Sequence, residues 1–158
     1  MAGDWLTAIE QWPVAAALRG SFYIYPLVNA AHIVGIAILV GAIVPLDLRI
    51  LGAYRSVPLD LLARILIPSA ATGAAIAVVA GMLLFTVKPH EYLANAAFIT
   101  KLGLVTLGGA NLVVVHATPA WRWARAGNPV APLLRANAVA SIVIWLAAIL
   151  AGRWIGFL

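Results

Sequence analysis

The chain has 158 residues, of which 65% are hydrophobic and only 9% are charged, so it lacks the polar side chains needed to cover a water-exposed surface. It contains no cysteine, which excludes disulfides, thiolate metal sites and cysteine nucleophiles. Its net charge of +5 comes from basic residues placed singly in short segments, a pattern typical of membrane topology and not of nucleic-acid binding.

The first element expected along the chain is a short amphipathic helix within residues 4–18. Trp5, Ile9 and Trp12 recur at helical spacing with polar residues between them. The stretch is too short and too polar to cross a membrane, so we expect it to lie in the interface between lipid and water. Pro13 is expected to kink this helix or to start a new one.

Four long apolar stretches follow, and each has enough residues to cross the ~30 Å hydrocarbon core as a helix. We expect spans at residues 22–46, 65–87, 94–115 and 134–155. The connecting segments, including residues 117–129, are expected to be loops. Because short connections join antiparallel neighbours, the sequence predicts an all-α, integral membrane, up-down four-helix bundle in one domain over residues 1–158.

The second span carries a stripe of small residues. Gly73, Ala77 and Gly81 are four residues apart, so they share one face of the helix. Small side chains at this spacing let another helix approach closely. We expect close helix packing at this stripe, and we predict that small-residue faces join the chain to a protein partner or to a second copy of itself.

The distribution of lysine and arginine predicts the orientation of the spans. Segments 47–64 and 116–135 carry six of the ten basic residues. The positive-inside rule places these segments in the cytoplasm and both termini on the other side of the membrane. Where the first span ends, Asp47 and Arg49 are expected to pair with each other or with the loop backbone.

Strongly polar side chains inside a membrane are costly, so each one needs a reason. The candidate binding residues are Asn29, His32, Lys101, Asn111 and His116. His32 is the best candidate, because an imidazole here could bind a haem iron or another metal, relay protons or hold a quinone head group. The alternative is a neutral imidazole hydrogen-bonded to a neighbouring helix. Asn29 lies three residues earlier on the same helical face.

The remaining candidates also have structural interpretations. Lys101, two turns into the third span, can extend to the outer interface or bind an anionic head group, a haem propionate or Glu91. Asn111 lies beside Gly108 and is expected to form hydrogen bonds across a close helix crossing. His116 ends the third span, where a histidine needs no special purpose.

A haem b held by two histidines from different helices can be tested by depth. At about 1.5 Å per residue, His32 lies ~15 Å and His116 ~30 Å from the outer ends of their spans. Axial ligands of one iron lie at nearly the same depth, so these two histidines do not easily share a haem. His90 lies nearer in depth to His32, and a haem with a single histidine ligand also stays open.

The sequence contains no recognisable catalytic set. HExxH, GxSxG and P-loop motifs are absent. The five acidic residues lie near the expected membrane surfaces, so no buried pair of carboxylates is expected. We therefore predict that the protein is not an enzyme.

Three motifs resemble those of a known family. The first span contains YPLVNAAHIVGIAILVGAIVPLDLRILG, the third contains Asn95-x-x-Phe98-x-x-Lys101 followed by Asn111 and His116, and GRWIGF lies near the end. Over nearly its whole length the chain resembles a family of small four-span bacterial inner-membrane proteins of unknown function. The resemblance implies a multi-pass inner-membrane protein, whose termini would then be periplasmic, but it implies no activity.

Two functions follow from these features. The first is a non-enzymatic membrane subunit or binding module that packs against partner helices. The alternative is an electron-transfer subunit that binds haem b through His32. Copper handling is disfavoured, because the chain has two methionines and no cysteine, and these are the soft ligands that Cu(I) prefers.

Overall fold

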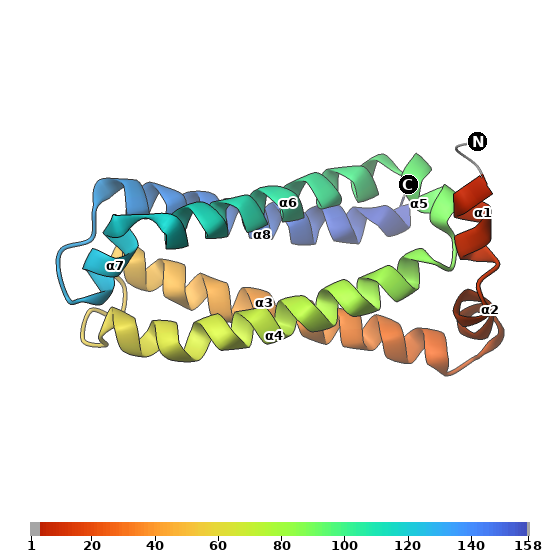
Figure 1. Ribbon diagram of the computed structural model, residues 1–158, viewed down its shortest axis with the longest axis horizontal. Helices are drawn as coiled ribbons and strands as arrows, with labels where there is room; N and C mark the ends of the chain where they lie inside the picture. Colours follow the sequence, from red (N-terminus) through yellow and green to blue (C-terminus); the bar gives the residue numbers. More distant parts are fainter. Residues whose placement is uncertain (1–3, 158) are drawn as a thin grey trace.

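The computed structural model describes residues 4–157, and every regular element in this range is helical (Figure 1). Four helices are long and apolar enough to cross a membrane. They are α3 (Ile24–Leu51), α4 (Leu59–Phe85), α6 (Ala96–Ala117) and α8 (Pro132–Trp154), the last continued by a short 3-10 helix, η1 (Ile155–Phe157). These helices pack against one another, so the prediction of an all-α membrane bundle is confirmed.

At the connection between α3 and α4, both helices extend beyond the apolar stretches that predicted them. The first span was expected to end at residue 46 and the second to begin at 65, but α3 runs to Leu51 and α4 starts at Leu59. Gly52 ends α3 with a left-handed φ of 111° and donates its N–H to the Arg49 carbonyl. The length of an apolar stretch indicates how much of a helix lies in lipid, whereas capping of the backbone sets the residue at which the helix ends.

The N-terminal segment forms two helices where one was expected. The helices α1 (Asp4–Glu10) and α2 (Pro13–Gly20) are separated by Gln11 and Trp12. Pro13 starts the second helix, as the sequence suggested, because the first turn of a helix does not use the N–H that proline lacks. The buried residues of α2 are Ala15 and Leu18, so this helix packs its apolar side against the end of the bundle.

Two connections between the spans contain short helices of their own. One is α5 (Pro89–Ala94), between α4 and α6, and the other is α7 (Pro119–Arg125), between α6 and α8. The prediction of a loop over residues 117–129 was therefore wrong. A helix of two turns is too short to show hydrophobic periodicity in the sequence, and both helices are marked only by a proline in their first turn.

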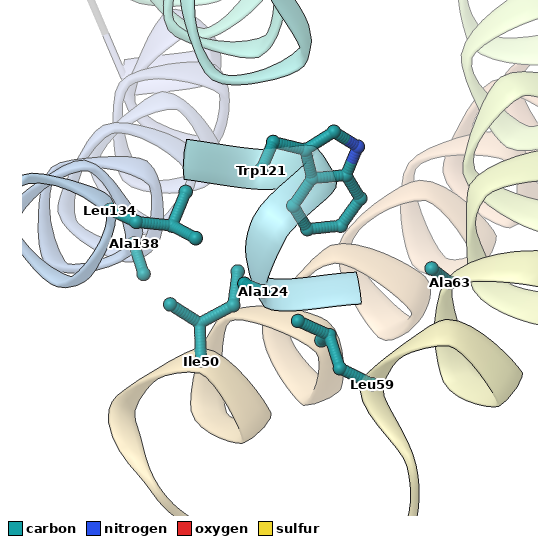
Figure 2. Packing of buried hydrophobic residues seen from close by; sticks show 7 residues of the cluster. All are labelled: Ile50, Leu59, Ala63, Trp121, Ala124, Leu134 and Ala138. Atoms are coloured by element: carbon teal, nitrogen blue, oxygen red, sulfur yellow. The ribbon is translucent and has the colours of Figure 1, made fainter. Parts of the chain in front are cut away.

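The helix α7 closes the end of the bundle that lies opposite the two termini (Figure 1). Its Trp121 is only 3% exposed and packs with Ala124. Figure 2 shows these two side chains between residues of α3, α4 and α8, including Ile50, Leu59 and Leu134. This apolar cluster joins three spans at one end of the bundle.

The closest packing in the bundle is between α3 and α4, where glycines face each other. A methyl group added to Gly73 would lie 2.5 Å from the Leu39 backbone nitrogen, and one added to Gly35 would lie 2.6 Å from the Ala77 nitrogen. The small-residue stripe of α4 is thus covered by α3 of the same chain. It explains packing inside the bundle, and it is not the surface that would receive a partner helix.

Replacing Gly73 by alanine tests this contact. The added methyl group would collide with the backbone of α3, so we expect a loss of about 1–3 kcal/mol in stability, as for other overpacked sites. The measurement is thermal unfolding of the detergent-solubilised protein. Gly103→Ala is the matched control, because Gly103 is also helical but has no atom of another residue within 4 Å of an added methyl group. Equal melting temperatures for the two variants would contradict the close contact.

Candidate functional site

Two of the predicted residues, His32 on α3 and Lys101 on α6, meet inside the bundle. The Nζ atom of Lys101 lies 3.3 Å from Nε2 of His32, and both side chains are half-buried. The other ring nitrogen, Nδ1, lies 2.7 Å from the Ala77 carbonyl oxygen on α4. Because a carbonyl only accepts hydrogen bonds, Nδ1 carries the ring hydrogen, and Nε2 presents its lone pair to Lys101.

Glycines on the other two spans make room for this pair. A methyl group on Gly81 of α4 would lie 3.0 Å from Cε1 of His32. A methyl group on Gly152 of α8 would lie 3.5 Å from the Cδ and Cε atoms of Lys101. All four spans therefore contribute to the site. His32 lies in the third turn of α3 and Lys101 in the second turn of α6, so the site is toward the end of the bundle where both termini are found (Figure 1).

Asn95 sets the start of α6 and thereby the position of Lys101. Its side-chain oxygen accepts a hydrogen bond from the Phe98 N–H at 3.1 Å, which caps the helix. Its Nδ2 group donates to the Ile155 carbonyl at 3.2 Å, which ties α6 to the end of α8. In the Asn95-x-x-Phe98-x-x-Lys101 motif, the first residue caps the helix and the last one reaches the interior.

The other predicted candidates lie apart from this pair. Asn29 is exposed, and its side chain has no hydrogen bond within the described part of the chain. Asn111 donates a hydrogen bond to the Asn137 carbonyl at 3.2 Å, which links α6 to α8. His116 is exposed near the opposite end of the bundle, where its ring packs against Trp121 with 5.1 Å between the ring centroids.

The α4–α6 connection carries charged and phenolic groups at the same end of the bundle as the His32–Lys101 pair. Lys88 Nζ lies 2.9 Å from a carboxylate oxygen of Glu91, and this hydrogen bond raises the pKa of the lysine. Glu91 is thus paired with Lys88 and not with Lys101. Burial raises the pKa of Tyr92 to about 12, and the nearby phenol of Tyr25 on α3 raises it as well. The phenol therefore stays neutral at physiological pH.

Asp47 is a polar residue whose burial the sequence analysis did not predict. It is only 8% exposed, Ser141 of α8 lies beside its carboxyl group, and Oδ2 has no partner within residues 4–157. Arg49 donates instead to the Val57 carbonyl at 2.7 Å, so of the two expected pairings only the one with the loop backbone forms. The helix α3 continues past residue 46, so Asp47 lies within the helix and faces the bundle instead of lying in a loop.

Metal binding would have to depend on few ligands. Among the described residues, no three histidine, aspartate or glutamate side chains come together in a group that could hold a metal ion. His90 is near the surface, with Nε2 3.5 Å from the hydroxyl oxygen of Thr7. His32 therefore stands without a second histidine beside it.

Comparison with known proteins identifies a family for this chain but no activity. A family model matches residues 16–158, which include all four spans and both members of the interior pair. The chain belongs to DUF6644, a family of unknown function. No curated protein and no solved structure matches the chain. Membership of DUF6644 thus assigns no activity, and a function must be argued from the geometry of the site.

Replacing Asn95 tests how the start of α6 is held. Asparagine caps contribute about 0.5–2 kcal/mol, so Asn95→Ala is expected to lower the unfolding temperature of the solubilised protein. Asn95→Asp keeps the capping oxygen and removes only the donor to Ile155, so its loss should be smaller. Equal losses in the two variants would contradict the capping role and assign the effect to the bond with Ile155.

Proposed function

We propose that this chain is a non-enzymatic binding module of the membrane, and that its ligand binds at His32 and Lys101. The observation that carries the proposal is the 3.3 Å approach of Lys101 Nζ to His32 Nε2 inside the bundle. Ionisable residues within spans are costly, and those that face a bundle interior commonly mark binding sites. A role in packing alone would need neither a lysine nor a histidine at these positions.

The charge of Lys101 supports a ligand. No carboxylate among the described residues forms an ion pair with Lys101, because Glu91 is paired with Lys88 and Asp60 with two arginines. A cation in a membrane interior is stabilised by an anionic or strongly accepting partner. The His32 lone pair supplies one acceptor, and a bound ligand would supply a second.

The hydrogen-bonding roles of His32 and Lys101 restrict the class of ligand. Nε2 of His32 accepts a hydrogen bond, because Nδ1 already holds the ring hydrogen against the Ala77 carbonyl. Lys101 only donates. On binding, a head group with a hydroxyl donor and an oxygen acceptor would replace the direct contact of the pair: its hydroxyl would donate to Nε2 of His32 and its oxygen would accept from Lys101. A quinol is a membrane-soluble molecule of this kind.

Haem b is a second candidate, supported by a separate observation. A histidine that ligates a metal commonly donates its other ring N–H to a carbonyl or a carboxylate, and the bond from Nδ1 of His32 to Ala77 is of this type. His32 would be the axial ligand, and Lys101 would be placed to contact a propionate. His116 lies near the other end of the bundle, so this candidate is a haem with one histidine ligand in an electron-transfer subunit.

The proposal includes the surroundings of the module. Apolar side chains such as Met82 and Val113 are exposed on the spans and would be covered by lipid or by the helices of a partner subunit. Six of the ten basic residues lie in segments 47–64 and 116–135, which supports cytoplasmic placement of the end closed by α7. In an inner membrane, the His32–Lys101 site would then lie toward the periplasm.

The first measurement is an absorption spectrum of the detergent-purified protein, oxidised and then reduced with dithionite, from cells supplied with haem. A Soret band with α and β bands that sharpen on reduction would establish a b-type cytochrome. His32→Ala should then abolish the spectrum, while His116→Ala should keep it. A featureless spectrum would exclude the haem candidate and leave the binding module.

Quinol binding provides the test of the module itself. A short-chain quinol, decylubiquinol, is expected to raise the unfolding temperature of the wild-type protein. Each lost hydrogen bond to a charged group should weaken binding about tenfold or more, so His32→Gln and Lys101→Met are expected to reduce the response. His116→Gln is the matched control and should respond like the wild type. No response of the wild-type protein, together with a featureless spectrum, would contradict the proposed site.

A further inference from the structure

An open hollow of about 800 Å³ lies between α2, the first turn of α3 and the end of α4. Most of its wall is apolar or aromatic. Phe22 is 85% exposed and Leu27 is 68% exposed, so large apolar side chains face outward at this place. The residues that line the hollow include Leu18, Arg19, Ser21, Phe22, Leu27 and Val87.

Arg19 brings a positive charge to this apolar wall. Its Nη1 group donates to the Val87 carbonyl at 3.1 Å, and its Nη2 group donates to the Glu10 carbonyl at 2.6 Å. Both partners are neutral backbone groups. Glu91 is paired with Lys88, and no carboxylate within residues 4–157 forms an ion pair with Arg19. The guanidinium is held in place while its charge stays uncompensated.

Ser21 adds a second donor beside Arg19. Its hydroxyl oxygen accepts hydrogen bonds from the N–H groups of Tyr23 at 3.3 Å and Ile24 at 3.2 Å. A hydroxyl that accepts two bonds can still donate its own hydrogen, and no acceptor within the described residues takes it. A guanidinium and a hydroxyl at the rim of an apolar wall suit a phosphate group with hydrocarbon chains attached.

We propose that this hollow binds an anionic phospholipid. The head-group phosphate would accept hydrogen bonds from Arg19 and Ser21, and an acyl chain would lie against Leu18, Phe22 and Leu27. The place fits a lipid, because α2 leads directly into the first span and so brings the hollow to the membrane surface. The net negative charge of the lipid would balance Arg19, which a zwitterionic lipid does less well. This site is separate from the His32–Lys101 pair and does not depend on its function.

The test compares two lipids with the same chains. Dioleoylphosphatidylglycerol and dioleoylphosphatidylcholine are added to the detergent-solubilised protein, and bound lipid is measured by native mass spectrometry and by the shift in unfolding temperature. The wild-type protein is expected to prefer the phosphatidylglycerol. Arg19→Gln should weaken that preference about tenfold, as expected for loss of charge-assisted hydrogen bonds.

Two further variants keep the test decisive. Arg153→Gln is the matched control, because Arg153 is an exposed arginine at the same end of the bundle whose guanidinium lies over the Phe157 ring. Leu27→Trp keeps Arg19 and its backbone contacts but fills part of the hollow, so it should also reduce the lipid preference. This variant takes the place of Arg19→Gln in the test if Arg19→Gln fails to fold. Equal binding of the two lipids, or equal losses in Arg19→Gln and Arg153→Gln, would overturn the proposal.

Discussion

The contact between α3 and α4 at Gly35 and Gly73 is the interaction from which the rest of the arrangement follows. Lipid chains are as apolar as leucine, so helices in a membrane are held together mainly by close van der Waals packing and by hydrogen bonds between them. Here the two backbones approach so closely that a single added methyl group would collide with the neighbouring helix. That approach fixes the rotation of α3, and with it the direction in which His32 points.

The same packing holds His32, a residue that is costly inside a membrane, in one fixed position. With α3 held against α4, His32 rests on Gly81 and bonds to the Ala77 carbonyl. Its free ring nitrogen is thereby directed away from α4 and toward Lys101. Gly81 on α4 and Gly152 on α8 leave space for His32 and Lys101. The site therefore depends on these two glycines as much as on the two polar side chains.

The two ends of the bundle differ in a way that bears on access to the site. At one end, α7 inserts Trp121 into an apolar cluster, and Asp60 is bonded to Arg64 at 2.6 Å and to Arg125 at 2.5 Å. That end is closed by packing and by ion pairs. At the other end, the interior pair lies only a few turns from the ends of the spans, and no apolar cluster like that around Trp121 is found there among the described residues.

The sequence by itself determined the number of spans, their order and the helical class, because about 20 consecutive apolar residues are needed to cross lipid and this length can be read along the chain. It also identified His32 and Lys101 as costly residues within spans. Only the tertiary structure decided that these two meet, that Asn29 faces outward and that Asp47 is buried against Ser141. Those outcomes depend on how each helix is rotated about its own axis, and that rotation is set by contacts with other helices, which hydropathy does not record.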